Sequence, residues 1–246
     1  MKPILLQAFG LLAFGVVHGT EYLVVIDPGH GGAKDSGSEK ARTLSASNNA
    51  TSPSGLNEKD LTLELSLEVA KQLKEIGKTR ATKVNCALTR TTDSNPDFAK
   101  RAAFCASLKQ VPAVIFSIHF NATTKHDAIG SVAVIRQEGK NPNYQADRKF
   151  ATGLTKAAST GVSRFVPGSS AMQPITDAHL HGGAGSNFFF QLAGHEQLRA
   201  VPKCFLEIEF IDRADTEAKL LLQRKAAFPD IARSIAIYLY DYCGSR

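Results

Sequence analysis

An apolar run that ends in a Pro-Gly turn, Val24-Val25-Ile26-Asp27-Pro28-Gly29-His30-Gly31-Gly32, decides the fold class of this chain. Its continuous apolar residues predict a strand covered on both faces, as in a parallel sheet. In open α/β sheets, ligands bind outside the carboxyl ends of the strands, and glycines there allow tight turns. His30 therefore stands where a site residue is expected, and it is a candidate metal ligand.

Further apolar runs predict more strands, and segments with helical periodicity lie between them. With the first strand included, the expected strands are residues 22–26, 84–88, 113–119, 131–135, 187–192 and 203–209. The expected helices are residues 58–76, 98–109, 144–160 and 229–242. Strands that alternate with helices are typical of an α/β fold, in which helices cover a central sheet.

The ends of these helices carry recognisable signals. In the first helix, apolar residues recur at every fourth position, at Leu61, Leu65, Val69 and Leu73. We expect Asn57 to cap that helix, Asp97 to cap the next one, and Pro229 to stand in the first turn of the last one. Residues 31–57 and 161–186 are rich in small and polar residues, and we expect both segments to be irregular.

The beginning of the chain has the three parts of a secretory signal peptide. Lys2 gives the positive start, residues 4–17 are apolar apart from Gln7, and small residues precede Thr20. The apolar run is short for a membrane span. We therefore expect residues 1–19 to be a signal peptide and residues 20–246 to form one exported domain, without a membrane anchor.

Composition limits the class of partner. The formal net charge is +6, an excess that suits an anionic polymer such as a cell wall. Because the sequence has no arginine-rich run and no aromatic stacking platform, we do not expect it to bind nucleic acid. The four cysteines are Cys86, Cys105, Cys204 and Cys243. They are compatible with disulfides in an exported protein, and buried free thiols are the alternative.

Two histidines and two glutamates lie at or near the ends of predicted elements. They are His30 after the first strand, Glu58 at the start of the first helix, His119 at the end of a later strand, and Glu207 inside the last strand. Two imidazoles and one carboxylate are a typical catalytic zinc set, with a fourth position open to water. A second carboxylate, buried in an apolar strand, has a raised pKa and can transfer protons. Each residue alone also has an ordinary structural reading, and Glu209 has the same strand parity as Glu207.

Longer motifs around these residues follow one another along the chain. They are the quoted segment 24–32, Asn57-Glu58-Lys59-Asp60-Leu61, Leu88-Thr89-Arg90-Thr91-Thr92-Asp93, Arg101 in the following helix, Ser117-Ile118-His119-Phe120-Asn121-Ala122, and Leu206-Glu207-Ile208 with Phe210-Ile211. In this order and spacing, over residues 22–242, the chain resembles zinc-dependent N-acetylmuramoyl-L-alanine amidases of the type that separates bacterial daughter cells.

The resemblance implies that His30, Glu58 and His119 bind one zinc ion and that Glu207 is the catalytic acid/base. It implies a twisted, mostly parallel, mixed six-stranded sheet with helices on both faces. The expected reaction is hydrolysis, by zinc-activated water, of the amide between N-acetylmuramic acid and the L-alanine of the peptidoglycan stem peptide. We expect a periplasmic monomer that acts on peptidoglycan, and an activator protein is a candidate partner.

The chain departs from the family pattern at several places, one of which is Cys105-Ala106, where family members often have Ala-Asn. The link between the first histidine and the glutamate ligand is unusually long, at residues 33–57. Glu209 stands where a glycine commonly occurs, and it places an extra carboxylate near the expected site. Residues 161–186, with His179 and His181, have no familiar counterpart, and we expect ordinary loop histidines there.

Two other functions stay open at the level of sequence. A zinc peptidase that cuts within the stem peptide would use the same ligand set, and a non-catalytic wall-binding protein would keep the same fold. Acylation of a serine is not expected, because the Ser-x-x-Lys and Lys-Thr-Gly motifs are absent. The masses of the reaction products distinguish the two cleavage reactions.

Overall fold

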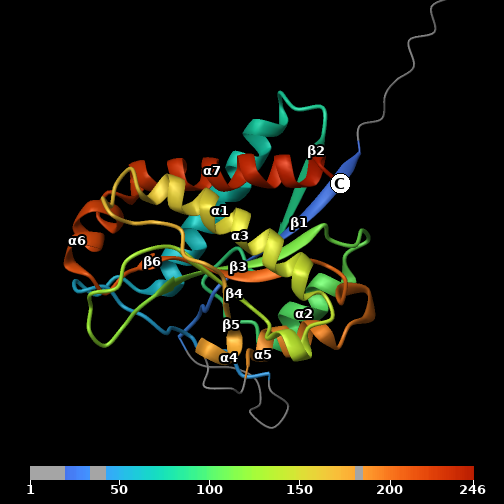
Figure 1. Cartoon of the computed structure of the whole chain (residues 1–246), viewed down its shortest axis with the longest axis horizontal. Helices are drawn as coiled ribbons and strands as arrows, with labels where there is room; N and C mark the ends of the chain where they lie inside the picture. Colours follow the sequence, from blue (N-terminus) through green and yellow to red (C-terminus); the bar gives the residue numbers. More distant parts are fainter. Residues whose placement is uncertain (1–19, 34–42, 181–184) are drawn as a thin grey trace, which may run out of the picture.

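The computed structural model describes residues 20–33, 43–180 and 185–246, which Figure 1 draws in colour. The expected signal peptide, residues 1–19, lies outside the described residues, as do His181 and the middle of the connection over 31–57. Residues 43–57, which are described, contain no helix or extended strand, in agreement with the expected loop. Within the described part of the chain, no helix has both the length and the apolar composition needed to cross a membrane.

Six strands of the described chain form one mixed sheet. They are β1 (Glu21–Pro28), β2 (Lys83–Leu88), β3 (Val114–Asn121), β4 (Val132–Ile135), β5 (Ile175–Thr176) and β6 (Lys203–Phe210). Their order is β2-β1-β3-β6-β4-β5, and neighbours run parallel except β4 and β6, which are antiparallel. Parallel neighbours require crossover connections, and helices make most of these. The predicted α/β class, with a mostly parallel mixed sheet, is confirmed.

Helices cover both faces of the sheet (Figure 1). The main helices of the described chain are α1 (Glu58–Gly77), α2 (Phe98–Ser107), α3 (Tyr144–Val162), α5 (Asn187–Ala193) and α7 (Arg224–Gly244). Shorter segments are α4 (Asp177–Leu180), α6 (Ala214–Thr216), two 3-10 turns (Glu138–Lys140 and Glu196–Leu198) and a π-helical turn (Glu217–Leu221). The larger core lies under α1, α3 and α7 and contains Leu65, Phe150 and Ile235. The smaller core lies under α2 and α5 and contains Ile115 and Phe205.

The segment 187–192 is a helix, so the strand predicted there is wrong. Phe188, Phe189 and Leu192 are buried, at a spacing that suits one face of a helix. Ser186 caps this helix, because its hydroxyl accepts from the amide of Phe189 at 3.4 Å. A short apolar run does not distinguish a strand from a buried helix, and here the cap decides. The sheet's strand that was not predicted is β5, which lies in the segment 161–186 that was expected to be irregular.

One of the three predicted helix starts is confirmed: Asp97 caps α2 by accepting from Lys100 N at 2.8 Å. The other two differ from the structure. Asn57 occupies the cap position of α1 but makes no side-chain capping bond. Asn48 serves instead, since its Oδ1 accepts from Lys59 N at 3.1 Å. Pro229 is inside α7, because that helix begins earlier, at Arg224, directly after the π-helical turn.

All four cysteines are free thiols, so the disulfide alternative is not realised. Three of them are buried, and Cys86 in β2 is partly buried. Burial raises the pKa of the Cys86 and Cys105 thiols to about 12, which keeps both in the unreactive protonated form.

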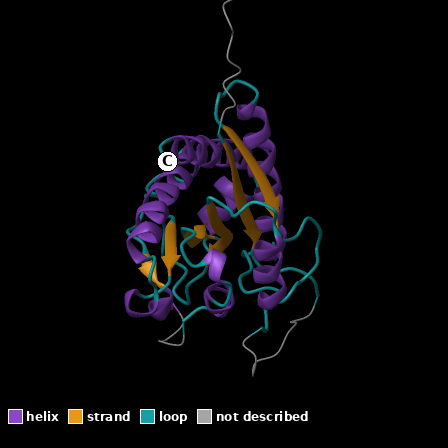
Figure 2. Ribbon diagram, turned by 90° about the vertical axis from the view of Figure 1, so that its right-hand side faces the viewer, coloured by secondary structure: helices purple, strands orange, loops and turns teal. Residues whose placement is uncertain are grey.

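The carboxyl ends of β1, β3 and β6 meet at one edge of the sheet. Pro28 pairs with Ile118, and His119 pairs with Glu207 in the next ladder. In Figure 2 the arrowheads of the longest strands point toward the loops at this end of the molecule. The topology thus collects the residues that follow the strands into one place, as expected for an α/β sheet.

Candidate metal centre and active site

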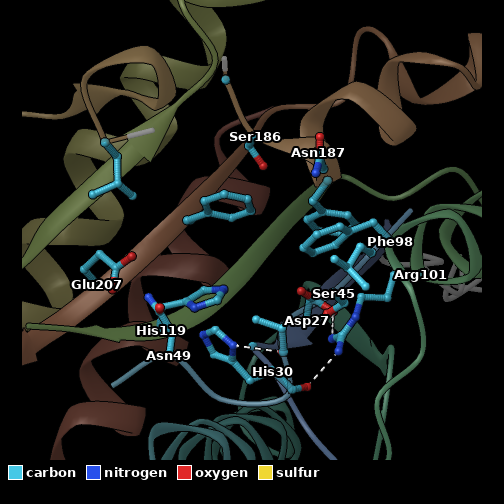
Figure 3. A pocket seen from close by; sticks show the side chains of 17 residues that line it. Asp27, His30, Ser45, Asn49, Phe98, Arg101, His119, Ser186, Asn187 and Glu207 are labelled. Carbon is cyan, nitrogen blue, oxygen red and sulfur yellow. Dashed lines mark hydrogen bonds and ion pairs between the residues drawn. The ribbon is translucent and has the colours of Figure 1, made fainter. Parts of the chain in front are cut away.

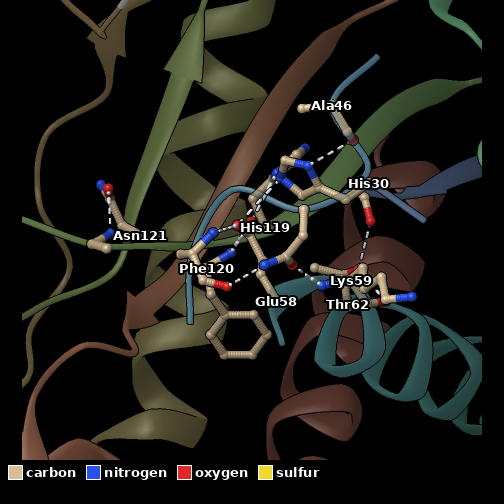
Figure 4. A network of polar contacts seen from close by, with 12 residues as sticks. His30, Ala46, Glu58, Lys59, Thr62, His119, Phe120 and Asn121 are labelled. Atoms are coloured by element: carbon tan, nitrogen blue, oxygen red, sulfur yellow. Dashed lines mark hydrogen bonds and ion pairs between the residues drawn. The ribbon is translucent and has the colours of Figure 1, made fainter. Parts of the chain in front are cut away.

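The side chains of His30, Glu58 and His119 converge at the carboxyl ends of β1 and β3 (Figure 4). One potential ligand atom from each residue lies within 4.8 Å of the others. Glu58 is between the two histidines, with Oε2 3.2 Å from His30 Nε2 and Oε1 3.1 Å from His119 Nδ1. The two rings meet edge to face, with centroids 4.9 Å apart. The fold therefore brings together the three residues that the sequence suggested for one metal ion.

Backbone groups orient these side chains. Ala50 N donates to Glu58 Oε2 at 3.1 Å, and Phe120 N donates to Oε1 at 3.0 Å. His30 Nδ1 lies 3.1 Å from the carbonyl oxygen of Ala46, so we assign the ring proton to Nδ1 and the lone pair to Nε2. His30 Nε2 is buried and makes no hydrogen bond. Imidazoles that are fixed through one nitrogen and present the other are typical of metal ligands.

The turn after β1 leaves room only for glycine beside His119. A Cβ atom on Gly29 would lie 2.4 Å from His119 Cε1, and one on Gly31 would lie 2.0 Å from the carbonyl oxygen of Ser94. His30 itself has φ of 60°, in the left-handed region that non-glycine residues rarely adopt. Such conformations persist only where the surroundings enforce them, and they cluster at functional sites.

Two buried arginines hold the carbonyl groups of this turn. Arg90 donates to Pro28 O at 3.0 Å and to Gly29 O at 2.8 Å. Arg101 donates to Pro28 O at 2.9 Å and to His30 O at 2.7 Å. Because each arginine bridges two carbonyls, the backbone that carries His30 is fixed from both sides.

Asp27 neutralises Arg101 beneath the turn. Its Oδ1 accepts from Arg101 Nη1 at 2.7 Å and from the Thr89 hydroxyl, and its Oδ2 accepts from Ser117 Oγ at 2.6 Å. Burial alone would raise the pKa of Asp27, but Arg101 and the two hydroxyl donors outweigh it and hold the pKa below its usual value. Asp27 is therefore an ionised, fully paired carboxylate and is not available for proton transfer.

Glu58 is ionised too. Burial raises the pKa of Glu58, but the two neighbouring imidazoles, His119 and His30, lower it by more, to about 2. Glu58 in turn affects His30. Burial lowers the pKa of His30, but the neighbouring Glu58 raises it by more, so the net change is an increase. A buried carboxylate between two imidazoles supplies the oxygen and nitrogen ligands that zinc prefers.

Glu207 differs from these two carboxylates in charge state. It lies on β6 as the register partner of His119, and its carboxyl group points into the cleft (Figure 3). Burial raises its pKa to about 7; His119 opposes this shift and Glu58 adds to it. A carboxyl group with a pKa near neutrality can both accept and donate a proton.

These side chains open onto a cleft of about 520 Å³ (Figure 3). His30, His119 and Glu207 line it together with an apolar wall formed by Phe98, Phe188 and Phe205. Its polar lining includes Ser45, Asn49, Ser186 and Asn187. A cleft of this size, mostly apolar with a few converging polar groups, is typical of an enzyme site.

Comparison with known proteins identifies the family. A family model described as N-acetylmuramoyl-L-alanine amidase matches residues 24–236, most of the chain. The chain belongs to this amidase family. It is accordingly a peptidoglycan amidase, a hydrolase of the cell wall. No curated protein matches the chain.

Solved amidase structures share the fold. The catalytic domain of the amidase CwlV from Bacillus (Paenibacillus) polymyxa var. colistinus is 23% identical, with a TM-score of 0.63, covering 92% of this chain and 99% of that one. The amidase Ami1 from Mycobacterium smegmatis is 20% identical, with a TM-score of 0.65 and coverages of 92% and 98%. CwlD from Clostridioides difficile, solved in complex with the GerS lipoprotein, is 18% identical, with a TM-score of 0.61 and coverages of 92% and 100%. At these identities the likeness concerns the fold.

Glu209 does not take part in the site of this amidase, contrary to what its parity suggested. Its side chain is fully buried, and its oxygens accept from Gly130 N at 2.8 Å, Phe210 N at 2.9 Å and the Ser169 hydroxyl. The register of β3 and β6 shifts just after Glu207, where β6 holds one residue more than β3. A bulge of this kind re-aims side chains, so alternation along the strand fails there.

Several residues of the amidase site had no assigned role in the sequence. Lys59 donates to Gly32 O at 2.9 Å and pairs with Asp93 at 2.7 Å, while Gly32 N donates to Asp93 at 2.6 Å. These residues lie inside the motifs quoted from the sequence, and that position was a sign of a role in the site. Their contacts join distant parts of the chain, so local patterns could not reveal them. His179 lies exposed on α4, a short helix, and not in the loop expected there.

Proposed function

We propose that this chain hydrolyses the amide between N-acetylmuramic acid and the L-alanine of the stem peptide at the cleft described above. His30, Glu58 and His119 would hold one zinc ion, and Glu207 would be the general acid/base. The observation that carries this proposal is the convergence of the three candidate ligand atoms within 4.8 Å beside a carboxyl group whose pKa is about 7.

The residues fit a zinc ion. Two contacts among the candidate ligand atoms measure 3.1 and 3.2 Å, close to the roughly 3.4 Å between ligands of a tetrahedral ion with bonds of about 2.1 Å. The buried His30 Nε2, which makes no hydrogen bond, would gain a partner. Bound zinc supplies Lewis-acid activation of a water molecule and of the scissile carbonyl.

The remaining chemistry falls to residues of this chain. Glu207, as a carboxylate, would accept a proton from the attacking water and then donate it to the leaving nitrogen of L-alanine. The apolar wall of Phe98, Phe188 and Phe205 would exclude water around that transfer and strengthen its electrostatics. Asp27, Arg90 and Arg101 would act at a distance, by fixing the turn that presents His30.

The cellular setting forms part of the proposal. The wall substrate lies outside the cytoplasm, and we propose that residues 1–19 direct export to a periplasm, where residues 20–246 act as a monomer. The structure of CwlD with GerS supports a search for a protein partner of this chain as well.

Mass spectrometry of products from purified sacculi incubated with the zinc-loaded protein tests the function. We expect free stem peptides with an intact L-alanine amino end, and none after treatment with a chelator. Loss of terminal D-alanine alone would instead establish a peptidase. Binding to sacculi without any product, in the presence of zinc, would leave the wall-binding alternative.

A further inference from the structure

A second cavity shares α5 with the catalytic cleft. Its volume is about 260 Å³, and its lining includes Arg136, Asp147, Phe189, Arg199 and Lys203. The first residues of α5 line the catalytic cleft, whereas Phe189 and Ala193 line this second cavity. Lys203 begins β6 while Glu207 is close to its end, so the two cavities open toward opposite ends of that strand.

The second cavity collects positive charge. Three of its lining side chains, Arg136, Arg199 and Lys203, are cationic, and Asp147 is the one acidic residue among the described lining residues. Lys203 is 93% buried, because only 7% of its surface is exposed. Burial lowers the pKa of Lys203; Asp147 opposes that shift, and the positive charge of Arg136, which lines the same cavity, adds to it.

The carboxylate of Asp147 is already occupied by other donors. Its Oδ1 accepts from Lys203 N at 3.0 Å and from Asn143 Nδ2 at 2.9 Å, and its Oδ2 accepts from Asn141 Nδ2 at 2.9 Å. Lys203 Nζ donates only to the carbonyl oxygen of Arg199, at 3.3 Å, among the described residues. Within the same part of the chain, Asp147 makes no direct ion pair with any of the three cationic groups.

Cations held together in a partly enclosed space repel one another, and an anion between them removes that cost. The planar guanidinium group of arginine matches carboxylate and phosphate oxygens in pairs, and a buried ammonium adds a third donor. We propose that this cavity binds a small oxyanion, a carboxylate or phosphate group, between Arg136, Arg199 and Lys203.

Calorimetric titration of the zinc-loaded protein with inorganic phosphate, and separately with succinate, tests this site at constant ionic strength. The double variant Arg136→Gln/Arg199→Gln removes two of the three cationic donors and keeps the buried Lys203, because both arginines are more exposed than that lysine and their replacement should disturb folding less. Lys225→Gln is the control, because it removes one exposed positive charge from α7, a helix that contributes no residue to the described lining of this cavity. The ranking of the two anions tells a phosphate site from a carboxylate site.

We expect saturable binding of at least one anion, weakened about tenfold or more in the double variant and unchanged in Lys225→Gln. The catalytic centre is intact in the double variant, so phosphate bound to the catalytic metal ion would persist there. Equal affinity of the double variant and the unsubstituted protein, or no saturable binding of either anion, would overturn the proposal.

Discussion

Arg101 and Asp27 form an ion pair with almost no exposure to solvent, 1% for the arginine side chain and 3% for the aspartate, with Nη1 and Oδ1 2.7 Å apart. The same guanidinium group binds the carbonyl oxygen of His30. A charge pair in β1 and α2 therefore supports the turn from which a candidate zinc ligand projects. This contact matters for both stability and function, because breaking it would leave an unpaired buried charge and would also free the turn that carries His30.

Asp27→Asn should destabilise the protein by about 3 kcal/mol at neutral pH, because Arg101 stays buried without its counter-charge. The pKa of Asp27 is lowered in the folded state, so its contribution is fully present above the unfolded value of about 3.9 and is lost as the pH falls below it. Urea unfolding of both proteins between pH 7 and pH 3 measures this.

The control for this prediction is Asp241→Asn, which breaks the exposed pair with Arg80 and should cost less than about 1 kcal/mol. An equal destabilisation by Asp27→Asn at pH 3 and pH 7 would contradict the assigned charge of Asp27.

Gly29→Ala should displace the His119 ring, since the new Cβ would lie 2.4 Å from Cε1. We expect loss of amidase activity and weaker zinc retention, with a folded protein by circular dichroism. Gly139→Ala is the matched substitution, because a Cβ there meets nothing within 4 Å. If Gly29→Ala kept full activity, the close approach of the turn to His119 would not matter for catalysis.

Glu58→Ala should weaken zinc binding on the order of 100-fold or more, because it removes one of three protein ligands. Elemental analysis of the dialysed protein gives the zinc content directly. Glu75→Ala removes an exposed glutamate from the same helix, one that forms an ion pair with Lys78 on the surface, and should retain the metal. Equal zinc content in the two variants would remove Glu58 from the ligand set.

Glu207→Gln should lower kcat by about 10²- to 10⁴-fold while zinc stays bound, as expected when a general acid/base is lost. Glu209→Gln provides a matched comparison on the same strand. Its amide oxygen can still accept from Gly130 and Phe210, so we expect a lower Tm and a kcat within about threefold of the unsubstituted protein. The reverse pattern would exchange the roles of the two glutamates.

The pH profile of kcat/KM provides a further check on Glu207. Burial raises the pKa of Glu207 to about 7, and a bound cation beside it would lower that value. Because the reaction needs the carboxylate as base, activity should rise with pH, with a midpoint at or below about pH 7, and then level off. In Glu207→Gln the residual activity should no longer rise with pH in this range. If the rise persisted, it would belong to the titration of another group.

Local patterns were sufficient for most of the fold. Leu61, Leu65, Val69 and Leu73 are all buried in α1 as their spacing predicted. The run over 187–192 was not decided by pattern, since an apolar segment of that length suits a strand or a helix equally. The start of α7 was also missed, because the chain passes through a π-helical turn and continues as a helix that accommodates Pro229.

By itself, the sequence determined the α/β class and the four residues of the candidate centre, because strand ends and helix starts are marked by local residue types. The tertiary structure decided what depends on distant contacts. It separated Glu207 from Glu209 through a register shift between β3 and β6. It also gave Arg90 and Arg101 their roles on the carbonyls of the turn after β1. The two arginines reach backbone carbonyls more than sixty residues away in the sequence, and the register shift depends on how two distant strands pair. Local periodicity encodes neither.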